Sequence, residues 1–311
     1  MKSLELFRKP PFRTKVTDTD LLERIDSIIN KRELEELKKK VALGNRILFH
    51  QGLADYHGHL SARIPGTRKF LIKPIMVSLG SITSRDVILL DIDAYKKVAE
   101  GNWAKVQGKR VPTRLKMPPR ETMIHAAIYE TRPDVNAVAH THQPLATAFS
   151  IAGVPLLPIY NQAAPFAPET PLFPSPRLIY TVQDGVELCQ ALGDRMAVLM
   201  RGHGITTVGE GVEQAVSNAI YLERTAYMQW VASSVGKPSL MPQTDIDFMK
   251  ENMRYRAYNA FDYFTMLLKN AKAVQPLERP TQRTTPALVS LDERREGSEA
   301  AVRMSRSKHH G

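Results

Sequence analysis

The stretch that most constrains the fold of this chain is 135–142, which reads Val-Asn-Ala-Val-Ala-His-Thr-His. It is apolar, contains β-branched residues and follows the turn-like Arg-Pro-Asp at 132–134, so it predicts a buried β-strand. Residues two apart on a strand point to the same face, so we expect His140 and His142 side by side. Two imidazoles at this spacing can bind one divalent metal ion, although a strand that ends in solvent could carry the same residues.

Length and composition favour an ordinary globular protein. The chain has 311 residues, of which 43% are hydrophobic, enough for one large domain with tails or for two small domains. No apolar run approaches the roughly 18 residues of a membrane-spanning helix, and the N-terminus lacks the hydrophobic core of a signal peptide. We therefore expect a soluble, cytoplasmic protein without a membrane partner. The single cysteine, Cys189, excludes a disulfide within the chain.

The formal net charge of +11 raises the question of nucleic-acid binding. The basic residues are scattered, however, and they form no zinc-finger spacing, aromatic RNA-binding motif or concentrated basic helix. An excess of cations suits a small anionic substrate equally well. We therefore predict a small anionic substrate and no nucleic-acid partner.

Strands interspersed with helices predict an α/β architecture, with helices covering a central sheet. We expect a flexible N-terminal arm at 1–18, one domain with a C-terminal helix at 19–274, and a disordered basic tail at 275–311. Apolar periodicity and turn residues mark the elements of the domain. Helices are predicted within 18–51 and at 118–131, 182–192, 212–235 and 245–273. A loop that leads into a strand is predicted at 53–64, and further strands at 70–74, 87–93, 135–142, 197–200 and 206–208. A hairpin and loop are predicted at 96–117, and a long ordered or lid-like loop at 163–176.

A third metal ligand is expected at His203, which lies between Gly202 and Gly204 directly after a predicted strand. Glycines on both sides let the backbone turn sharply and present a side chain at the end of a sheet. Taken alone, His203 fits an ordinary turn histidine just as well. Together with His140 and His142 it gives three imidazoles and an open position for water or substrate, which is typical of a Lewis-acid metal site.

Other polar residues are candidates for catalysis and substrate binding. Glu121 lies in the first turn of a predicted helix, where it is either a carboxylate favoured by the helix dipole or a general acid/base beside the metal. His59, Ser61 and Arg63 could contact substrate, although a polar row at a strand edge would look the same. His125 lies one turn after Glu121 and is expected in the core or behind a catalytic group.

The order of these motifs resembles that of the class II aldolase/adducin family. The chain carries Gly-x-x-Ser-x-Arg at 58–63, Pro-x-x-Glu at 118–121, His-x-His at 140–142 and a late His-Gly at 203–204. The resemblance covers roughly residues 30–240. Each motif is weak alone, but their combination in this order is specific.

The resemblance implies a three-layer α/β/α fold around a mostly antiparallel sheet. It also implies a homo-oligomer, usually a homotetramer, with the active site at a subunit interface. By this resemblance His140, His142 and His203 match the metal ligands, and Glu121 matches the glutamate that serves as acid/base. Tyr160 falls near the position of a substrate-facing tyrosine that is contributed across the interface.

Two departures from the sugar-phosphate aldolases of this family bear on the substrate. Those enzymes carry Gly-Asn where this chain has Gly58-His59, and Ser-Ser-Glu where it has Pro119-Arg120-Glu121. The missing Asn and serines bind phosphate there, which argues against a phosphorylated sugar here. The His59 imidazole and the Arg120 guanidinium can hold a carboxylate instead. Relatives with a histidine in this loop include decarboxylases of dihydroxylated aromatic acids.

We therefore predict a metal-dependent carbon–carbon lyase that acts on a small hydroxylated carboxylate, with decarboxylation of a dihydroxy-aromatic or related acid ahead of aldol cleavage of a hydroxy-carbonyl compound. One alternative is a non-catalytic, adducin-like oligomeric scaffold, which the basic tail favours and the complete set of histidines and glutamate disfavours. Another is oxygenase chemistry at an iron ion. Three imidazoles accept Zn²⁺, the expected ion, and also Mn²⁺, Co²⁺ or Fe²⁺.

Overall fold

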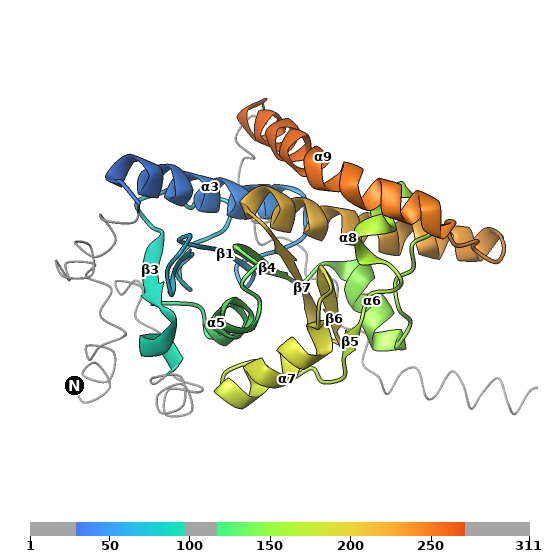
Figure 1. Cartoon of the computed structure of the whole chain (residues 1–311), viewed down its shortest axis with the longest axis horizontal. Helices are drawn as coiled ribbons and strands as arrows, with labels where there is room; N and C mark the ends of the chain where they lie inside the picture. The colour runs from blue at the N-terminus through green and yellow to red at the C-terminus, as the bar shows by residue number, and fades with distance from the viewer. Residues whose placement is uncertain (1–28, 97–116, 271–311) are drawn as a thin grey trace, which may run out of the picture. The chain divides into compact units, whose positions relative to one another are not determined.

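A seven-stranded sheet forms the centre of the fold in the computed structural model, which describes residues 29–96 and 117–270 (Figure 1). The strands are β1 (His59–Arg63), β2 (Lys69–Ile72), β3 (Ile88–Asp91), β4 (Ala137–Thr141), β5 (Leu172–Phe173), β6 (Ala197–Met200) and β7 (Gly204–Gly209). They are arranged in the order β3-β2-β1-β4-β7-β6-β5. All neighbouring strands are antiparallel except β5 and β6, so the sheet is mixed and mostly antiparallel.

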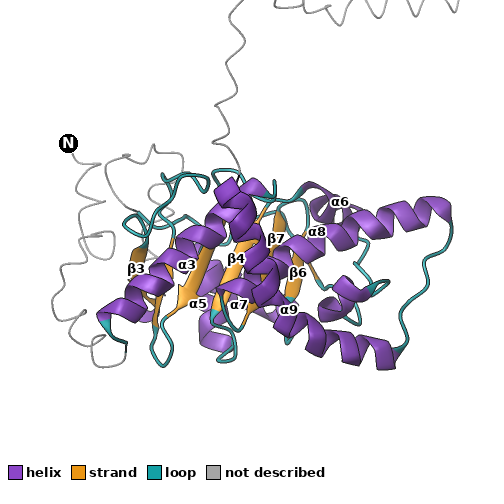
Figure 2. Cartoon of the chain, turned by 90° about the horizontal axis from the view of Figure 1, so that it is seen from above, coloured by secondary structure: helices purple, strands orange, loops and turns teal. Residues whose placement is uncertain are grey.

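Helices cover both faces of this sheet, as the views in Figures 1 and 2 show. The helices are α3 (Lys31–His50), α5 (Thr122–Thr131), α6 (Pro144–Ala152), the 3₁₀ helix η1 (Asn161–Phe166), α7 (Val182–Leu192), α8 (Val212–Val235) and α9 (Gln243–Asn270). Helices α3, α6, α8 and α9 share one hydrophobic core with the sheet, and α5 and α7 share another. The three-layer α/β/α arrangement predicted from the resemblance is confirmed.

Strand β4 lies in the middle of the sheet and is buried along its whole length. Ala137 and Ala139 face the core shared with α3 and α8, whereas Val138 faces the core shared with α5 and α7. Because side chains alternate along a strand, His140 points to the same side as Val138, toward α5. The same alternation places His59 of β1 on that side, since the register pairs it with His140. The fold therefore gathers polar side chains between the sheet and α5.

Most predicted elements are confirmed, and α7, α8 and β6 have the predicted bounds. Helix α5 begins at Thr122 instead of 118, because Glu121 occupies the N-cap position with a non-helical backbone. Helix α6 was not predicted, and the loop predicted at 163–176 includes part of η1 and all of β5.

Three predicted segments lie outside the described residues: the arm at 1–18, most of the hairpin and loop at 96–117, and the tail at 275–311. The domain boundaries at 19 and 274 stay predictions. Among the helices of the described ranges, none is both long and apolar enough to cross a membrane.

Candidate metal centre

Three histidines meet where β4 ends and the turn from β6 to β7 begins. His140 is the fourth residue of β4, His142 follows the last, and His203 lies in the turn before β7. A β-carbon on Gly204 would lie 2.4 Å from the Thr141 carbonyl oxygen and 2.7 Å from His142 Cδ2. Only glycine fits there, and its small size lets the turn that carries His203 approach the end of β4 closely.

The donor atoms of these histidines and of Glu121 converge. His140 Nε2 lies 3.0 Å from His142 Nε2. Glu121 Oε2 lies 3.3 Å from His203 Nε2 and 3.9 Å from His140 Nε2. One donor atom from each of the four residues lies within 4.8 Å of the others, so the group could hold one metal ion. The structure therefore brings together the four residues that the sequence analysis singled out.

The state of these residues fits a divalent cation. Both ring nitrogens of His203 are buried and have no hydrogen-bond partner within the described part of the chain. A buried polar atom without a partner costs about 1–3 kcal/mol, which a metal ion would remove by accepting a nitrogen lone pair. Burial also lowers the pKa of His140 and His142, and the nearby His203 imidazole lowers both further. Both imidazoles are therefore kept neutral, which is the form that binds metal.

Neighbouring groups orient two of the candidate ligands. His140 Nδ1 lies 3.3 Å from the Thr206 hydroxyl oxygen, which leaves Nε2 for the metal. Glu121 Oε1 accepts a hydrogen bond of 2.9 Å from the backbone N–H of Ile179, which leaves Oε2 directed at the histidines. Glu121 is an N-cap residue, yet its side chain makes no capping hydrogen bond to α5. Its carboxylate is thus available to the site.

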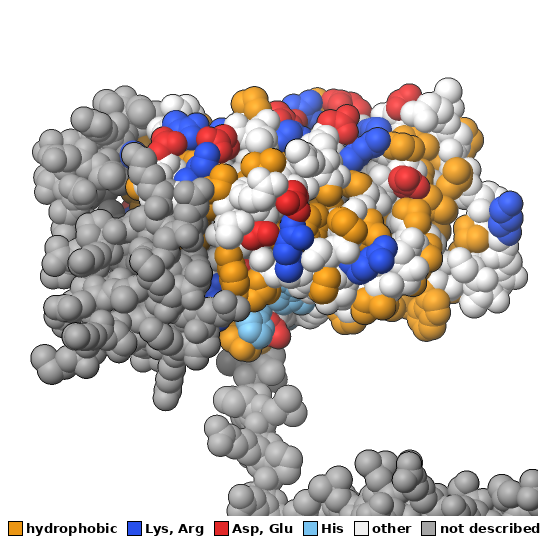
Figure 3. All heavy atoms as spheres, turned by 90° about the horizontal axis from the view of Figure 1, so that it is seen from below, with side chains coloured by type: hydrophobic (Ala, Val, Ile, Leu, Met, Phe, Trp, Pro, Cys, Tyr) orange, Lys and Arg blue, Asp and Glu red, His pale blue; other side chains and the backbone are white. Residues whose placement is uncertain are grey.

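A cavity of about 550 Å³ opens next to these donors. In the space-filling view, histidine side chains reach the surface beside acidic and hydrophobic side chains (Figure 3). The wall combines apolar side chains with cations, and Glu121 is its one acidic side chain among the described residues. The lining residues are Tyr56, His57, His59, Lys73, Ile75, Met76, Pro119, Arg120, Glu121, His142, Pro176, Leu178, Gly202 and His203.

Lys73 is a cavity residue that the sequence analysis missed. Its side chain follows β2 and is only 1% exposed. The ammonium donates to the Pro74 carbonyl at 2.9 Å and makes longer contacts of 3.3 and 3.5 Å with the carbonyls of Tyr56 and Ile75. Burial lowers its pKa to about 8, although Asp55 opposes this. A lone lysine at the end of an apolar strand gave no signal in the sequence that it would face a cavity.

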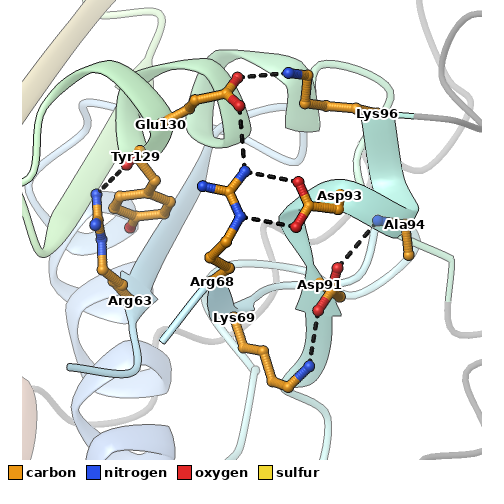
Figure 4. Close-up of polar contacts among 9 residues, drawn as sticks. All are labelled: Arg63, Arg68, Lys69, Asp91, Asp93, Ala94, Lys96, Tyr129 and Glu130. Carbon is orange, nitrogen blue, oxygen red and sulfur yellow. Dashed lines mark hydrogen bonds and ion pairs between the residues drawn. The ribbon is translucent and has the colours of Figure 1, made fainter. Parts of the chain in front are cut away.

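The predicted substrate residues separate into two groups. His59 and Arg120 line the cavity, whereas Ser61, Arg63 and Tyr160 are not among the lining residues. Ser61 is hydrogen-bonded to His125 and Tyr129 behind the cavity wall. The guanidinium of Arg63 donates to the backbone carbonyls of Tyr129 and Arg132, and it lies over the Tyr129 ring (Figure 4). The substrate-binding roles predicted for Ser61 and Arg63 therefore stay predictions.

Tyr160 lies before η1, where its hydroxyl is 3.4 Å from Gln162 Oε1. Its predicted action across a subunit interface involves a second chain and stays a prediction.

Comparison with known proteins places the chain in a family. The model of the class II aldolase and adducin N-terminal domain matches residues 39–230. The chain belongs to the class II aldolase/adducin family. This confirms the resemblance found in the motifs and agrees with the fold.

Individual relatives within this family have different activities. A 3,4-dihydroxyphthalate decarboxylase of Arthrobacter keyseri is 34% identical over 208 residues, which cover 64% of this chain and 79% of the relative. An L-ribulose-5-phosphate 4-epimerase of Salmonella paratyphi B is 27% identical over 240 residues, which cover 73% of this chain and 98% of the relative. The solved L-fuculose 1-phosphate aldolase of Glaciozyma antarctica superposes with a TM-score of 0.62 at 23% identity, over 76% of this chain and 92% of that chain.

Proposed function

We propose that this protein is a metal-dependent carbon–carbon lyase that decarboxylates a small dihydroxy-aromatic acid or a related hydroxylated carboxylate. The observation that carries the proposal is the convergence of three imidazoles and one carboxylate, with donor atoms within 4.8 Å, at the wall of a cavity. Three imidazoles with an open position are typical of a catalytic rather than a closed structural metal site. Zn²⁺ is the expected ion, with Mn²⁺, Co²⁺ and Fe²⁺ as alternatives.

The character of the cavity supports an aromatic carboxylate as substrate. Apolar side chains of Ile75, Met76 and Leu178 can pack against a ring, and the cations Lys73 and Arg120 suit its carboxylate. Similarity to a decarboxylase whose name specifies a dihydroxylated aromatic dicarboxylate points the same way.

The residues of the site suggest how the carbon–carbon bond is broken. A bound divalent cation would act as a Lewis acid and stabilise negative charge on neighbouring substrate oxygens. The bond between the ring carbon and the carboxylate breaks, CO₂ leaves, and the electron pair stays on the ring carbon. Glu121 then delivers a proton to that carbon from Oε2, because Oε1 is held by Ile179. Solvent reprotonates Glu121 through the open cavity.

The test uses Zn²⁺- and Mn²⁺-loaded protein with 3,4-dihydroxyphthalate and 3,4-dihydroxybenzoate, read by CO₂ release. His142→Ala removes one proposed ligand and should lose both bound metal and turnover, while His50→Ala changes an exposed histidine outside the site and should lose neither. Unchanged metal content and turnover in His142→Ala would contradict the proposal.

Parallel assays separate the alternatives. Carbonyl formation from a hydroxy-carbonyl compound without CO₂ release would indicate an aldolase, and oxygen consumption with Fe²⁺ would indicate an oxygenase. A defined oligomer without bound metal or any of these activities would favour the adducin-like scaffold. Sedimentation of the purified protein tests the proposed homotetramer.

A further inference from the structure

A buried chain of hydrogen-bonding side chains runs from the cavity wall into the layer between the sheet and α5. His59 Nδ1 lies 2.6 Å from His125 Nε2, and His125 Nδ1 lies 2.6 Å from Ser61 Oγ. Ser61 Oγ in turn lies 2.6 Å from the Tyr129 hydroxyl oxygen. None of the four side chains is more than 2% exposed, and only His59 lines the cavity. The chain therefore has one end at the cavity and one in the core.

The protonation states of His125, Tyr129 and Ser61 in this row of hydrogen-bonded side chains are fixed. Burial lowers the pKa of His125 to about 3, so its imidazole is neutral and has one N–H donor and one acceptor nitrogen. Burial raises the pKa of Tyr129, so its phenol keeps its proton. The Ser61 hydroxyl carries one proton and can donate to only one of its two neighbours.

Two arrangements of these protons are consistent with the distances. In the first, Tyr129 donates to Ser61, Ser61 donates to His125 Nδ1, and His125 Nε2–H donates to His59 Nδ1. Every donor in the chain then has an acceptor. His59 carries its own proton on Nε2, the ring nitrogen that takes no part in the chain.

In the second arrangement each of these hydrogen bonds runs in the opposite direction, and Tyr129 accepts from Ser61. Its own proton then has no acceptor among the contacts described for it, and a buried donor without an acceptor is costly. The first arrangement, in which the Tyr129 hydroxyl donates to Ser61, is therefore favoured.

We infer that His125, Ser61 and Tyr129 are positioning residues that hold His59 as its neutral Nε2–H tautomer, so that His59 gives an anionic oxygen of the substrate a hydrogen-bond donor and not a base. The inference rests on the proposed function for its substrate, an oxygen-rich carboxylate. It also gives Ser61 a defined place behind the wall of the site. Arg63 contributes indirectly, since it holds the Tyr129 backbone and ring at the far end of the chain (Figure 4).

The inference assigns different tasks to the polar groups of the cavity. His59 and Lys73 are both donors there, and Glu121 is the carboxylate that moves protons. A neutral donor can stabilise charge that develops on a substrate oxygen without giving up its proton. His59 is then a substrate-binding group that acts only as a hydrogen-bond donor, through Nε2–H.

Nitrogen-15 NMR of the zinc-loaded protein, labelled only at histidine, tests the tautomer directly, and a His59→Gln spectrum identifies the His59 signals. We expect coupling of the proton to Nε2 of His59. A proton on Nδ1 would overturn the inference. Because this measurement needs no turnover, it stays informative even if the protein proves not to be a decarboxylase.

Substitutions at His125 test the positioning role. His125→Gln keeps an N–H donor within reach of His59, whereas His125→Leu removes it. We expect His125→Gln to keep the Nε2–H tautomer and the affinity for 3,4-dihydroxybenzoate, and His125→Leu to weaken that affinity about 10- to 100-fold at unchanged metal content, as lost orienting partners commonly do. Equal affinities for the Gln variant, the Leu variant and the unmodified protein would overturn the positioning role. If His125→Leu does not fold, the NMR spectrum of His125→Gln tests the positioning role instead. A proton on Nδ1 of His59 in that variant would also overturn the role.

Discussion

The buried ammonium of Lys73 should make the protein less stable than its Lys73→Met variant at neutral pH. Burial lowers the pKa of this lysine from 10.5 to about 8. Since one pKa unit corresponds to about 1.4 kcal/mol, the charged side chain costs the folded state roughly 3 kcal/mol. Methionine has a similar length and no charge, but it gives up the 2.9 Å hydrogen bond to Pro74, worth about 1 kcal/mol. The expected net gain in the free energy of unfolding is about 2 kcal/mol at pH 7.

The pH dependence distinguishes this cause from better packing. Between pH 8 and 10.5 the unfolded chain binds more protons at Lys73 than the folded one, so the stability of the unmodified protein rises with pH in this window. The advantage of Lys73→Met should therefore shrink by about 2 kcal/mol between pH 7 and pH 9.5. Urea unfolding at both pH values measures the difference in the free energy of unfolding between Lys73→Met and the unmodified protein. Lys39→Met is the control, because the Lys39 side chain is 61% exposed. A Lys73→Met variant that is less stable at pH 7, or whose advantage does not change with pH, would refute the reasoning.

Three further predictions concern the metal centre. Glu121→Gln can still accept the Ile179 hydrogen bond but cannot transfer a proton, so turnover should fall about 10²- to 10⁴-fold while elemental analysis finds unchanged metal; equal turnover would contradict the acid/base role. His203→Ala should abolish the stabilisation by metal, about 2.7 kcal/mol in the unmodified protein when free Zn²⁺ is 100-fold above its Kd, as thermal unfolding with and without Zn²⁺ can show. Gly204→Ala should lower the free energy of unfolding by about 1–3 kcal/mol through overpacking, whereas Gly236→Ala, with no atom within 4 Å of the added carbon, should not.

The convergence of the candidate metal ligands could be predicted from the sequence because its signals are local. The period of a β-strand places His140 and His142 on one face, and the glycines around His203 indicate a turn at a strand end. Glu121 lies at a helix start, which the preceding prolines mark. Each of these signals depends on a few neighbouring residues, and the order of the motifs joined them into one site.

The cavity wall could not be predicted in the same way, because long-range packing decides which side chains reach it. His59, Ser61 and Arg63 share one face of β1, yet contacts with His125 and Tyr129 of α5 hold Ser61 and Arg63 away from the cavity, whereas His59 lines it. Lys73 faces the cavity because the segments at 56 and 75 fold around it. None of these contacts joins residues that are adjacent in a motif.

The central position of β4 has a consequence for how the gene can change. A slip or an inserted residue in this strand would exchange its two faces and turn His140 toward the apolar layer under α3 and α8. Both neighbours, β1 and β7, would have to shift with it. We therefore expect insertions and deletions in descendants of this sequence to accumulate in the loops and to spare β4. The number of residues from Ala137 to His142 should then stay constant, and with it the register of β4 against both neighbouring strands.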